Sequence, residues 1–467
     1  MVSLLCPGGV EFLSLTLCYN PRFASNSLSC NALGVPGLKR TFSALFVSML
    51  LIGGLSSCGS SSRTTTSGLK FRAFISNPLN PTISGSIFPG LNIADATRDV
   101  LSPFSVSLSG TTTSAGMMVE SPKRDRTVVF SPVTNTSTNV LAIVDNAKES
   151  ATGSVNLPGA TESMFITGDS TTLFAAIPTA AVPGQSAGAV VQINLSTPAI
   201  TATIPIAGAR FIIPGPNGNQ LLVISDTANS VTVLSPGLIS SGGGVTPVPF
   251  VFDRPAWAVF SADGTSAYVM NCGPECGGTT ASIAVVDLTQ TPPAVTSTVP
   301  VAAATFGLIS GGNLYVSGTP PNTGVDCQAN LCGALTIFSA ANLAATPLSL
   351  AITDGYHNHM VMAPNGQLFV GSRTCTDIIQ NPATSTPGRG CLSVVNTSAG
   401  TVYTASQNGD VTAIEPIDNR PVVYVCEGGA LQIYDTANDL GTGKQLELQK
   451  TQIAITGQAI DVKLADF

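Results

Sequence analysis

The chain has 467 residues and a formal net charge of −7, and only 10% of its residues are charged. Its 19 lysines and arginines form no basic stripe of the kind that phosphate neutralisation needs, so we expect no nucleic-acid partner. The 46 glycines and 32 prolines, together with 44% hydrophobic residues, favour many short strands joined by tight turns.

The first signal along the chain is an export segment. Lys39 and Arg40 precede an apolar stretch at 42–52, which is the arrangement of a secretory signal peptide. The stretch 41–57 includes small polar residues and is short for a segment that must span a bilayer with roughly 20 residues. We therefore favour a signal peptide over a transmembrane helix. Residues 1–38 are interpreted as an upstream extension, which predicts a translation start further downstream.

The run from Leu55 to Cys58 resembles the lipobox of bacterial lipoproteins. The resemblance implies that 1–57 are removed, that Cys58 is lipidated and that a membrane is a partner through this anchor. An ordinary secretory signal with a chance cysteine is the alternative. We expect a location in the cell envelope, at the outer membrane, with the domain on the periplasmic or extracellular side. Residues 58–68 are then a flexible Ser/Thr tether, and 69–467 form one domain.

From residue 69 onward one pattern of short strands recurs. Leu221–Ser225 with Val231–Leu234, and Ala267–Asn271 with Ile283–Asp287, are two copies of its second and third strands. Asn-Gly or Asp-Gly pairs precede several second strands, and such pairs favour tight hairpins. The period is about 49 residues, the length of a propeller blade. The sequence therefore predicts an all-β fold, a single β-propeller of four-stranded antiparallel blades.

The two ends of the domain predict how the ring closes. Phe71–Asn77 and Leu91–Asp95 look like second and third strands without a first strand, whereas Ala459–Leu464 looks like a first strand with nothing after it. Pairing of these N- and C-terminal strands completes a blade and removes an exposed edge. Counting that blade, we favour eight blades, with seven as the alternative because the N-terminal repeat is divergent. We expect a monomer.

The strings Leu314–Ser317 and Ala267–Asn271, the latter followed by Ile283–Asp287, resemble the YVTN-type propeller repeats of bacterial surface proteins. The resemblance covers nearly all of 69–467 and implies the fold. Such repeats occur in proteins with binding, scaffolding and lactonase roles, so the resemblance is poor for function. The single tryptophan, Trp257, argues against the tryptophan-docked quinoprotein dehydrogenases.

Six of the cysteines after Cys58 fall into pairs, each in the connection between the second and third strands of one of three consecutive repeats. Local disulfides are favoured in an oxidising compartment, and a zinc site is the sharper alternative. Cys426 is left over and is expected to be a buried thiol. The predicted disulfides are Cys272–Cys276, Cys327–Cys332 and Cys375–Cys391.

The sequence offers little catalytic chemistry. The segment Gly184–Gly188 matches a Gly-x-Ser-x-Gly pattern, but no helix follows it, as a nucleophile elbow requires. We therefore predict no catalytic residue, no resident metal and no cofactor. Function is expected where the segments leading into the innermost strands line one opening of the ring. The candidate ligand-binding residues there are Glu162, Arg210, Arg254, Trp257, His357, His359 and Asp410.

His357 and His359 are the only histidines, and a spacing of two on a strand predicts that they share a face. Histidines at a strand start also serve as hydrogen-bonded structure, and Arg210 or Arg254 could be ion-paired with Glu162 or Asp253. The leading hypothesis is a non-enzymatic binding or scaffold module for a protein, peptide or glycan. The alternative is a metal-dependent propeller hydrolase of lactonase type, with His357, His359, Glu162 and Asp410 around a divalent ion. A purely structural envelope protein is a third possibility.

Overall fold

A computed structural model describes most of the predicted domain. Residues 1–65, which contain the predicted signal peptide, Cys58 and most of the tether, lie outside the described residues. The described residues all belong to the compact unit Thr64–Phe467, and no helix among them is long and apolar enough to cross a membrane. The described ranges are 66–79, 90–108, 114–132, 139–321, 324–327, 330–376, 378–380, 387–405, 409–437 and 447–465.

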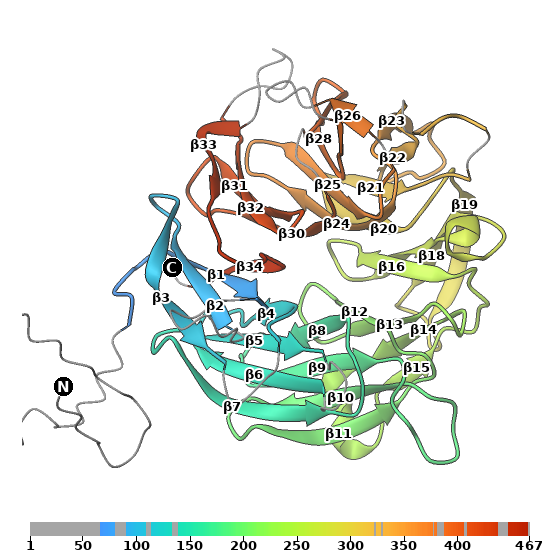
Figure 1. The fold of residues 1–467 in the computed structure, drawn as a ribbon. Helices are drawn as coiled ribbons and strands as arrows, with labels where there is room; N and C mark the ends of the chain where they lie inside the picture. The colour runs from blue at the N-terminus through green and yellow to red at the C-terminus, as the bar shows by residue number, and fades with distance from the viewer. Residues whose placement is uncertain are drawn as a thin grey trace, which may run out of the picture. The chain divides into compact units, whose positions relative to one another are not determined.

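Within these ranges the strands form eight four-stranded antiparallel sheets, which we number as blades 1 to 8 (Figure 1). Strands are given from the innermost outward. Blade 1 contains β34 (Asp461–Leu464), β1 (Arg72–Asn77), β2 (Gly90–Asp95) and β3 (Val100–Ser107). Blade 2 contains β4 (Met118–Glu120), β5 (Arg126–Ser131), β6 (Asn139–Asp145) and β7 (Ser150–Leu157). Blade 3 contains β8 (Ser163–Ile166), β9 (Thr172–Ile177), β10 (Ala189–Asn194) and β11 (Ala199–Pro205). Blade 4 contains β12 (Phe211–Pro214), β13 (Leu221–Ser225), β14 (Ser230–Leu234) and β15 (Val245–Pro247).

The remaining blades repeat this order. Blade 5 contains β16 (Pro255–Phe260), β17 (Ser266–Asn271), β18 (Ser282–Asp287) and β19 (Ala294–Pro300). Blade 6 contains β20 (Phe306–Ser310), β21 (Asn313–Gly318), β22 (Gly333–Ser339) and β23 (Leu348–Ile352). Blade 7 contains β24 (Tyr356–Met362), β25 (Gln367–Arg373), β28 (Leu392–Asn396) and β29 (Thr401–Thr404). Blade 8 contains β30 (Val411–Pro416), β31 (Val422–Glu427), β32 (Ala430–Asp435) and β33 (Glu447–Ile453). Outside the blades lie β26 (Ile378–Gln380), β27 (Pro387–Arg389) and the 3₁₀ helices η2 (Pro236–Ser241) and η3 (Gly273–Cys276).

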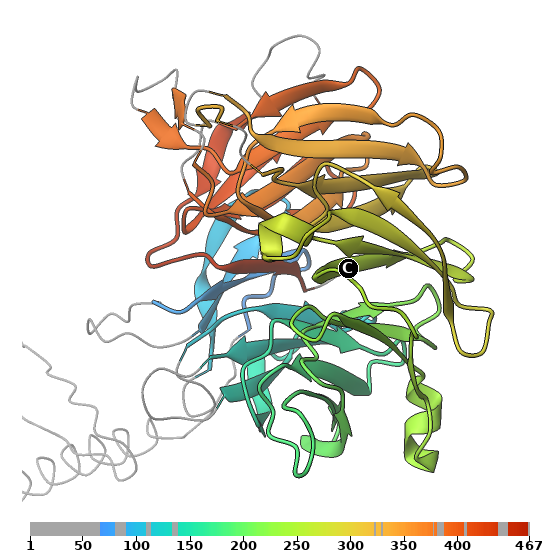
Figure 2. The ribbon, with the colours of Figure 1, turned by 90° about the vertical axis from the view of Figure 1, so that its right-hand side faces the viewer.

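The ring closes as the sequence predicts, and the count is eight. β34 pairs antiparallel with β1, with Asp461 opposite Ser76 and Leu464 opposite Ala73. Each innermost strand contacts the innermost strands of both neighbouring blades, from β4 and β8 round to β30 and β34. Seen from the side in Figure 2, the colour changes from cyan and green through yellow to orange and red, so blades that follow one another in sequence are neighbours in the ring.

The core lies between adjacent blades because second strands are buried on both faces. In β21, Leu314 and Val316 pack with blade 5, whereas Tyr315 packs with residues of blade 7. All five residues of β13 are buried. Burying one such apolar side chain contributes about 1.5–3 kcal/mol. Because successive side chains of the second strand in a blade face opposite neighbours, they stabilise the contacts with both neighbouring blades.

The turn and cysteine predictions also hold. Gly218, Gly264 and Gly366, which end the predicted Asn-Gly and Asp-Gly turns, have φ of 65°, 71° and 83°, a left-handed conformation that glycine adopts without strain. The three predicted disulfides are formed, with Cα–Cα distances of 5.6, 5.4 and 5.6 Å. Cys426 is a buried free cysteine.

Candidate functional site

One end of the ring gathers the predicted site residues, and we call it the mouth. There, in blades 5 and 8, the segment leading into the innermost strand contacts the connection between the second and third strands. The Cys272 amide donates to the Arg254 carbonyl oxygen at 2.9 Å, and the Ala459 amide donates to that of Gly429 at 2.8 Å. Because an antiparallel blade brings these two segments to the same end, the mouth is where loops of all blades converge.

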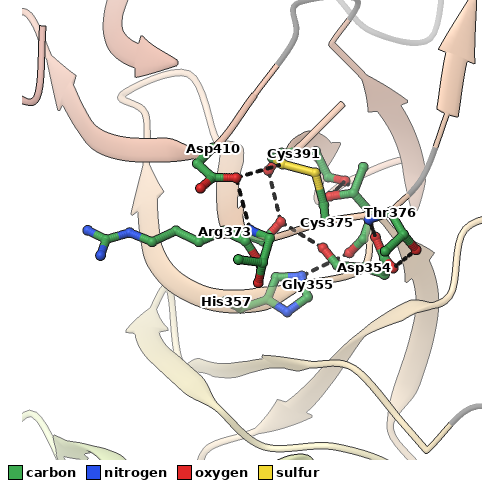
Figure 3. The surroundings of a disulfide bond; sticks show 12 residues. Asp354, Gly355, His357, Arg373, Cys375, Thr376, Cys391 and Asp410 are labelled. Carbon is green, nitrogen blue, oxygen red and sulfur yellow. Dashed lines mark hydrogen bonds between the residues drawn. A yellow bond between two sulfur atoms is a disulfide. The ribbon is translucent and has the colours of Figure 1, made fainter. Parts of the chain in front are cut away.

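Aspartates fix the mouth loops of blades 5 and 7. Asp253 accepts hydrogen bonds from the amides of Thr279 and Thr280 at 2.9 and 2.6 Å. Burial raises the pKa of Asp253, but these bonds outweigh it and hold the pKa below its usual range. Asp354 accepts from the amide of Thr376 at 2.6 Å beside the Cys375–Cys391 disulfide (Figure 3). Each loop is therefore closed twice, by a disulfide and by a carboxylate.

The loops of blades 5, 6 and 7 are also tied to one another. Glu275, inside the Cys272–Cys276 loop of blade 5, accepts from the Thr305 hydroxyl at 2.6 Å and from the Thr319 amide at 2.8 Å in blade 6. Burial raises the pKa of Glu275 despite these bonds. The Thr319 hydroxyl donates to the carbonyl oxygen of Gly355, next to blade 7, at 2.8 Å. We call the second-to-third connections of blades 5, 6 and 7 the stapled rim.

Arg210 is paired within the chain. Its guanidinium lies 2.9 Å from the Glu162 carboxylate and 2.6 Å from that of Asp226, and it stands over the Phe211 ring at 5.0 Å. Burial lowers the pKa of Arg210, but the two carboxylates outweigh it and raise the pKa. Glu162 is exposed, and such a pair contributes only about 0–1 kcal/mol, so a ligand can displace this carboxylate at little cost.

Arg254 and Trp257 stand on the segment that leads into blade 5. Arg254 has φ of 56°, and its backbone is held by the Asn229 side-chain oxygen, which accepts from its amide at 3.1 Å. Trp257 stacks on Phe306 with ring centroids 4.2 Å apart and meets Phe211 edge-on at 5.9 Å. The only tryptophan of the chain therefore belongs to an aromatic cluster of three neighbouring innermost strands.

The two histidines do not share a face, so that prediction is wrong. A bulge at Asn358 shifts the register, so His357 lies opposite Ser372 and His359 opposite Gly371, which are consecutive residues and face opposite sides. His357 is fully buried; its Nε2 lies 2.9 Å from the Thr353 carbonyl oxygen, and its Nδ1 has no hydrogen-bond partner among the described residues. Burial lowers the pKa of His357 to about 4.

His359 differs from its neighbour in contacts and surroundings. Its Nδ1 lies 2.9 Å from the side-chain oxygen of Asn358. Burial, followed by the charges of Arg373 and Lys463, lowers the pKa of His359 to about 3. Both imidazoles are therefore neutral at physiological pH, and neither is positioned to act with the other.

The four residues of the hydrolase hypothesis are not brought together. Glu162 pairs with Arg210, His357 bonds to Thr353, and the Asp410 carboxylate accepts from the Thr374 amide at 2.9 Å. Across the described ranges, no three His, Cys, Asp or Glu residues are grouped so that they could hold a metal ion. Figure 3 shows His357 and Asp410 on different sides of the segment around Arg373.

A pocket lies at the mouth beside Asp410, and the sequence analysis missed the rest of it. Its volume is about 400 Å³. Gly409 and Asp410 precede β30, Thr412 lies in β30, and the Gly428–Gly429 turn joins β31 to β32. The last three lining residues precede β34. The only sequence signal was the Gly-Gly pair itself. The pocket is lined by Gly409, Asp410, Thr412, Gly428, Gly429, Gln458, Ala459 and Ile460.

A charged group on the innermost strands was also missed. The Lys463 ammonium lies 3.1 Å from the Asp461 carboxylate and 3.9 Å from that of Glu415. Burial lowers the pKa of Lys463, but the two carboxylates outweigh it and the pKa is raised. Burial raises the pKa of Glu415, although Lys463 opposes the shift. The cluster joins blade 8 to blade 1. Its ion pairs therefore have a structural role at the ring closure.

No protein-family model and no curated protein sequence matches the chain. Among solved structures, the chain is similar to a dihydro-heme d1 dehydrogenase in complex with DHE, with a TM-score of 0.57 and 13% identity over 88% of this chain and 78% of that one. It is also similar to the hydrazine synthase of Kuenenia stuttgartiensis, with a TM-score of 0.50 and 14% identity over 70% and 96% of the two chains. A periplasmic gluconolactonase of Pseudomonas aeruginosa gives 0.49 and 13% over 84% and 98%. At such identities the likeness shows the propeller fold and nothing of activity.

Proposed function

We propose that the protein is an exported, membrane-anchored propeller that holds a protein, peptide or glycan at its mouth without transforming it. The stapled rim carries this proposal. Three consecutive blades each close their mouth loop with a disulfide, and Glu275 and Thr319 tie these loops together. Loops fixed in advance lose little conformational entropy when a ligand binds, which is the usual purpose of preorganisation.

The anchor belongs to the same proposal. Cys58 lies outside the described residues, and its support is the lipobox resemblance together with the disulfides, which are typical of exported proteins. The likeness of the repeats to the YVTN type, and an outer-membrane location, are likewise proposed. Substitution Cys58→Ala should move the protein from the membrane fraction to the soluble fraction and abolish fatty-acid labelling. Unchanged membrane retention would contradict the anchor.

The lactonase alternative receives no support from the geometry. Its expected metal ligands are dispersed among the described residues, as set out above. A lactone hydrolysis screen of the purified protein, with and without added divalent metal ions, tests this alternative directly. Metal-dependent turnover would replace the binding proposal.

The binding proposal is tested by chemical crosslinking in intact cells, followed by isolation of the tagged protein and mass spectrometry of the crosslinked residues. We expect one partner to be recovered in stoichiometric amount, with its crosslinks confined to the mouth. The Cys58→Ala variant serves as the control, because it keeps the same mouth residues but is no longer held at the membrane. Crosslinks spread over both ends of the ring, or confined to the opposite end, would overturn the proposal.

A further inference from the structure

The structure points to a ligand class for the mouth: we propose that the pocket at blade 8 binds a neutral saccharide unit. This inference rests on the proposed binding function and deepens it. The pocket lies next to the stapled rim, and its volume of about 400 Å³ falls within the range of about 300–1,000 Å³ for small-ligand sites. All eight residues that line it are among those the structure describes.

The connection of blade 8 that lines the pocket is short. The second and third strands of this blade are joined by the two-residue turn Gly428–Gly429, since Glu427 pairs directly with Ala430. In neighbouring blade 7 the same connection runs from Thr374 to Cys391 and carries a disulfide.

Three of the lining residues are the glycines Gly409, Gly428 and Gly429. Gly409 has φ of 115°, and a Cβ added there would lie 2.7 Å from the Cα of Gly428. Gly429 has φ of 83°, and its Cβ would lie 3.0 Å from the Cγ of Gln458. Both positions combine a left-handed backbone with close approach to another part of the chain, so only glycine fits there without strain. The walls of the pocket are glycine main chain, the polar residues Asp410, Thr412 and Gln458, and the apolar residues Ala459 and Ile460.

These walls are tied together before any ligand arrives. The Asp410 carboxylate accepts from the Thr374 amide at 2.9 Å, and the Asp410 carbonyl oxygen accepts from the Gly428 amide at 3.0 Å. The Ala459 amide donates to the Gly429 carbonyl oxygen at 2.8 Å. The walls come from blade 8 and from the segment before β34, and Thr374 of blade 7 holds the Asp410 side chain. The pocket is consequently preorganised in the same way as the rim.

The polar groups select a ligand with several hydroxyl groups. Asp410 supplies acceptors, the exposed amide of Gln458 supplies a donor and an acceptor, and Thr412 presents a hydroxyl whose proton is given to the Cys426 carbonyl oxygen at 3.4 Å. A sugar carries adjacent hydroxyls that each donate and accept, which matches this mixture within one compact volume. A peptide backbone spaces its donors and acceptors along an extended chain instead.

The other ligand classes fit less well. The Asp410 carboxylate repels anions, and it is the only carboxylate among the lining residues, so a divalent cation would lack ligands. The lining includes no aromatic side chain, and its apolar residues besides glycine are Ala459 and Ile460. A planar aromatic or lipid-like ligand would therefore find little surface to stack on. A neutral, hydroxyl-rich ligand remains.

The test uses saturation-transfer NMR on the purified full chain, with glucose, galactose, mannose and N-acetylglucosamine as neutral probes and glucuronate as an anionic one. We expect signals from neutral sugars and none from glucuronate. Asp410→Asn keeps an oxygen for the Thr374 amide but removes the charge, and Gln458→Leu removes the amide. Each should weaken binding on the order of tenfold. Gln185→Leu, an exposed glutamine in the mouth loop of blade 3, is the matched control and should leave binding unchanged.

Three results would overturn the saccharide assignment. They are no neutral-sugar signal, a preference for glucuronate, and sugar binding that is as strong in the Asp410 and Gln458 variants as in the wild type. Equal thermal unfolding of the variants and the wild type excludes misfolding as the cause of a loss. If crosslinking in cells recovers a mouth partner while the sugars fail, the saccharide site falls and the binding function stands. If both fail, both proposals fall.

Discussion

Leu464→Ala tests whether the C-terminal strand closes the ring or merely lies at its end. Leu464 is three residues from the C-terminus, yet only 1% of it is exposed, and it packs in one cluster with Ala73 of β1 and Tyr424 of β31. Truncation of a buried leucine to alanine costs about 2–5 kcal/mol of unfolding free energy, since it removes apolar contact and leaves a cavity. We expect a loss of that size.

The assay is urea unfolding followed by the fluorescence of Trp257. This tryptophan lies in blade 5, whereas Leu464 lies in blade 1, so a shift of its transition reports coupling through the ring. Leu348→Ala is the matched control, because Leu348 is 48% exposed on outer strand β23, and its change should stay within about 0.5 kcal/mol. If Leu464→Ala behaves like this control, β34 frays in solution and the closure described here is wrong.

Further predictions concern the rim and its surroundings. Replacing Cys375 and Cys391 together by alanine should lower the unfolding free energy by about 3 kcal/mol, the value for a loop of this length, as measured by urea unfolding; no change would mean that the bond is not formed. The pKa of His357 is lowered from 6.5 to about 4, so the unfolded chain binds the proton more tightly and stability should fall by about 3 kcal/mol as the pH drops through this window. This loss is the contribution of His357 alone, so His357→Asn should make that part of the stability curve less steep while the contribution of His359 remains, and an equally steep curve would contradict the burial. Asp253→Ala should speed amide exchange at Thr279 and Thr280, and unchanged exchange rates would show that the carboxylate does not hold this loop.

The fold could be predicted because it depends on local sequence patterns. Alternating apolar residues, Asn-Gly and Asp-Gly turns and a period of about 49 residues define each blade, and the incomplete repeats at the two ends predict the closure between β1 and β34. The disulfides followed from the position of paired cysteines in equivalent connections. These features depend on neighbours in sequence or on repetition, both of which are visible in a single chain.

The site was harder to predict because its geometry depends on register and on main chain. The bulge at Asn358 places His357 and His359 on opposite faces of the sheet, and the residue types around it do not predict a bulge. Three of the eight residues that line the pocket beside Asp410 are glycines, and its walls come from segments that are far apart in sequence, at 409–412, 428–429 and 458–460. Arg210 and Glu162 were correctly seen as a possible pair, but Asp226 as a second partner was not foreseen.

The most direct test of the central claim is site-specific photo-crosslinking in intact cells. A photoreactive amino acid replaces Val325, which is 47% exposed in the rim of blade 6, or Ala262, which is exposed in a turn at the opposite end of blade 5. The binding account predicts one crosslinked partner from position 325 and none from position 262. Crosslinking from position 262 alone, or from neither position in cells where the protein is anchored and folded, would contradict it.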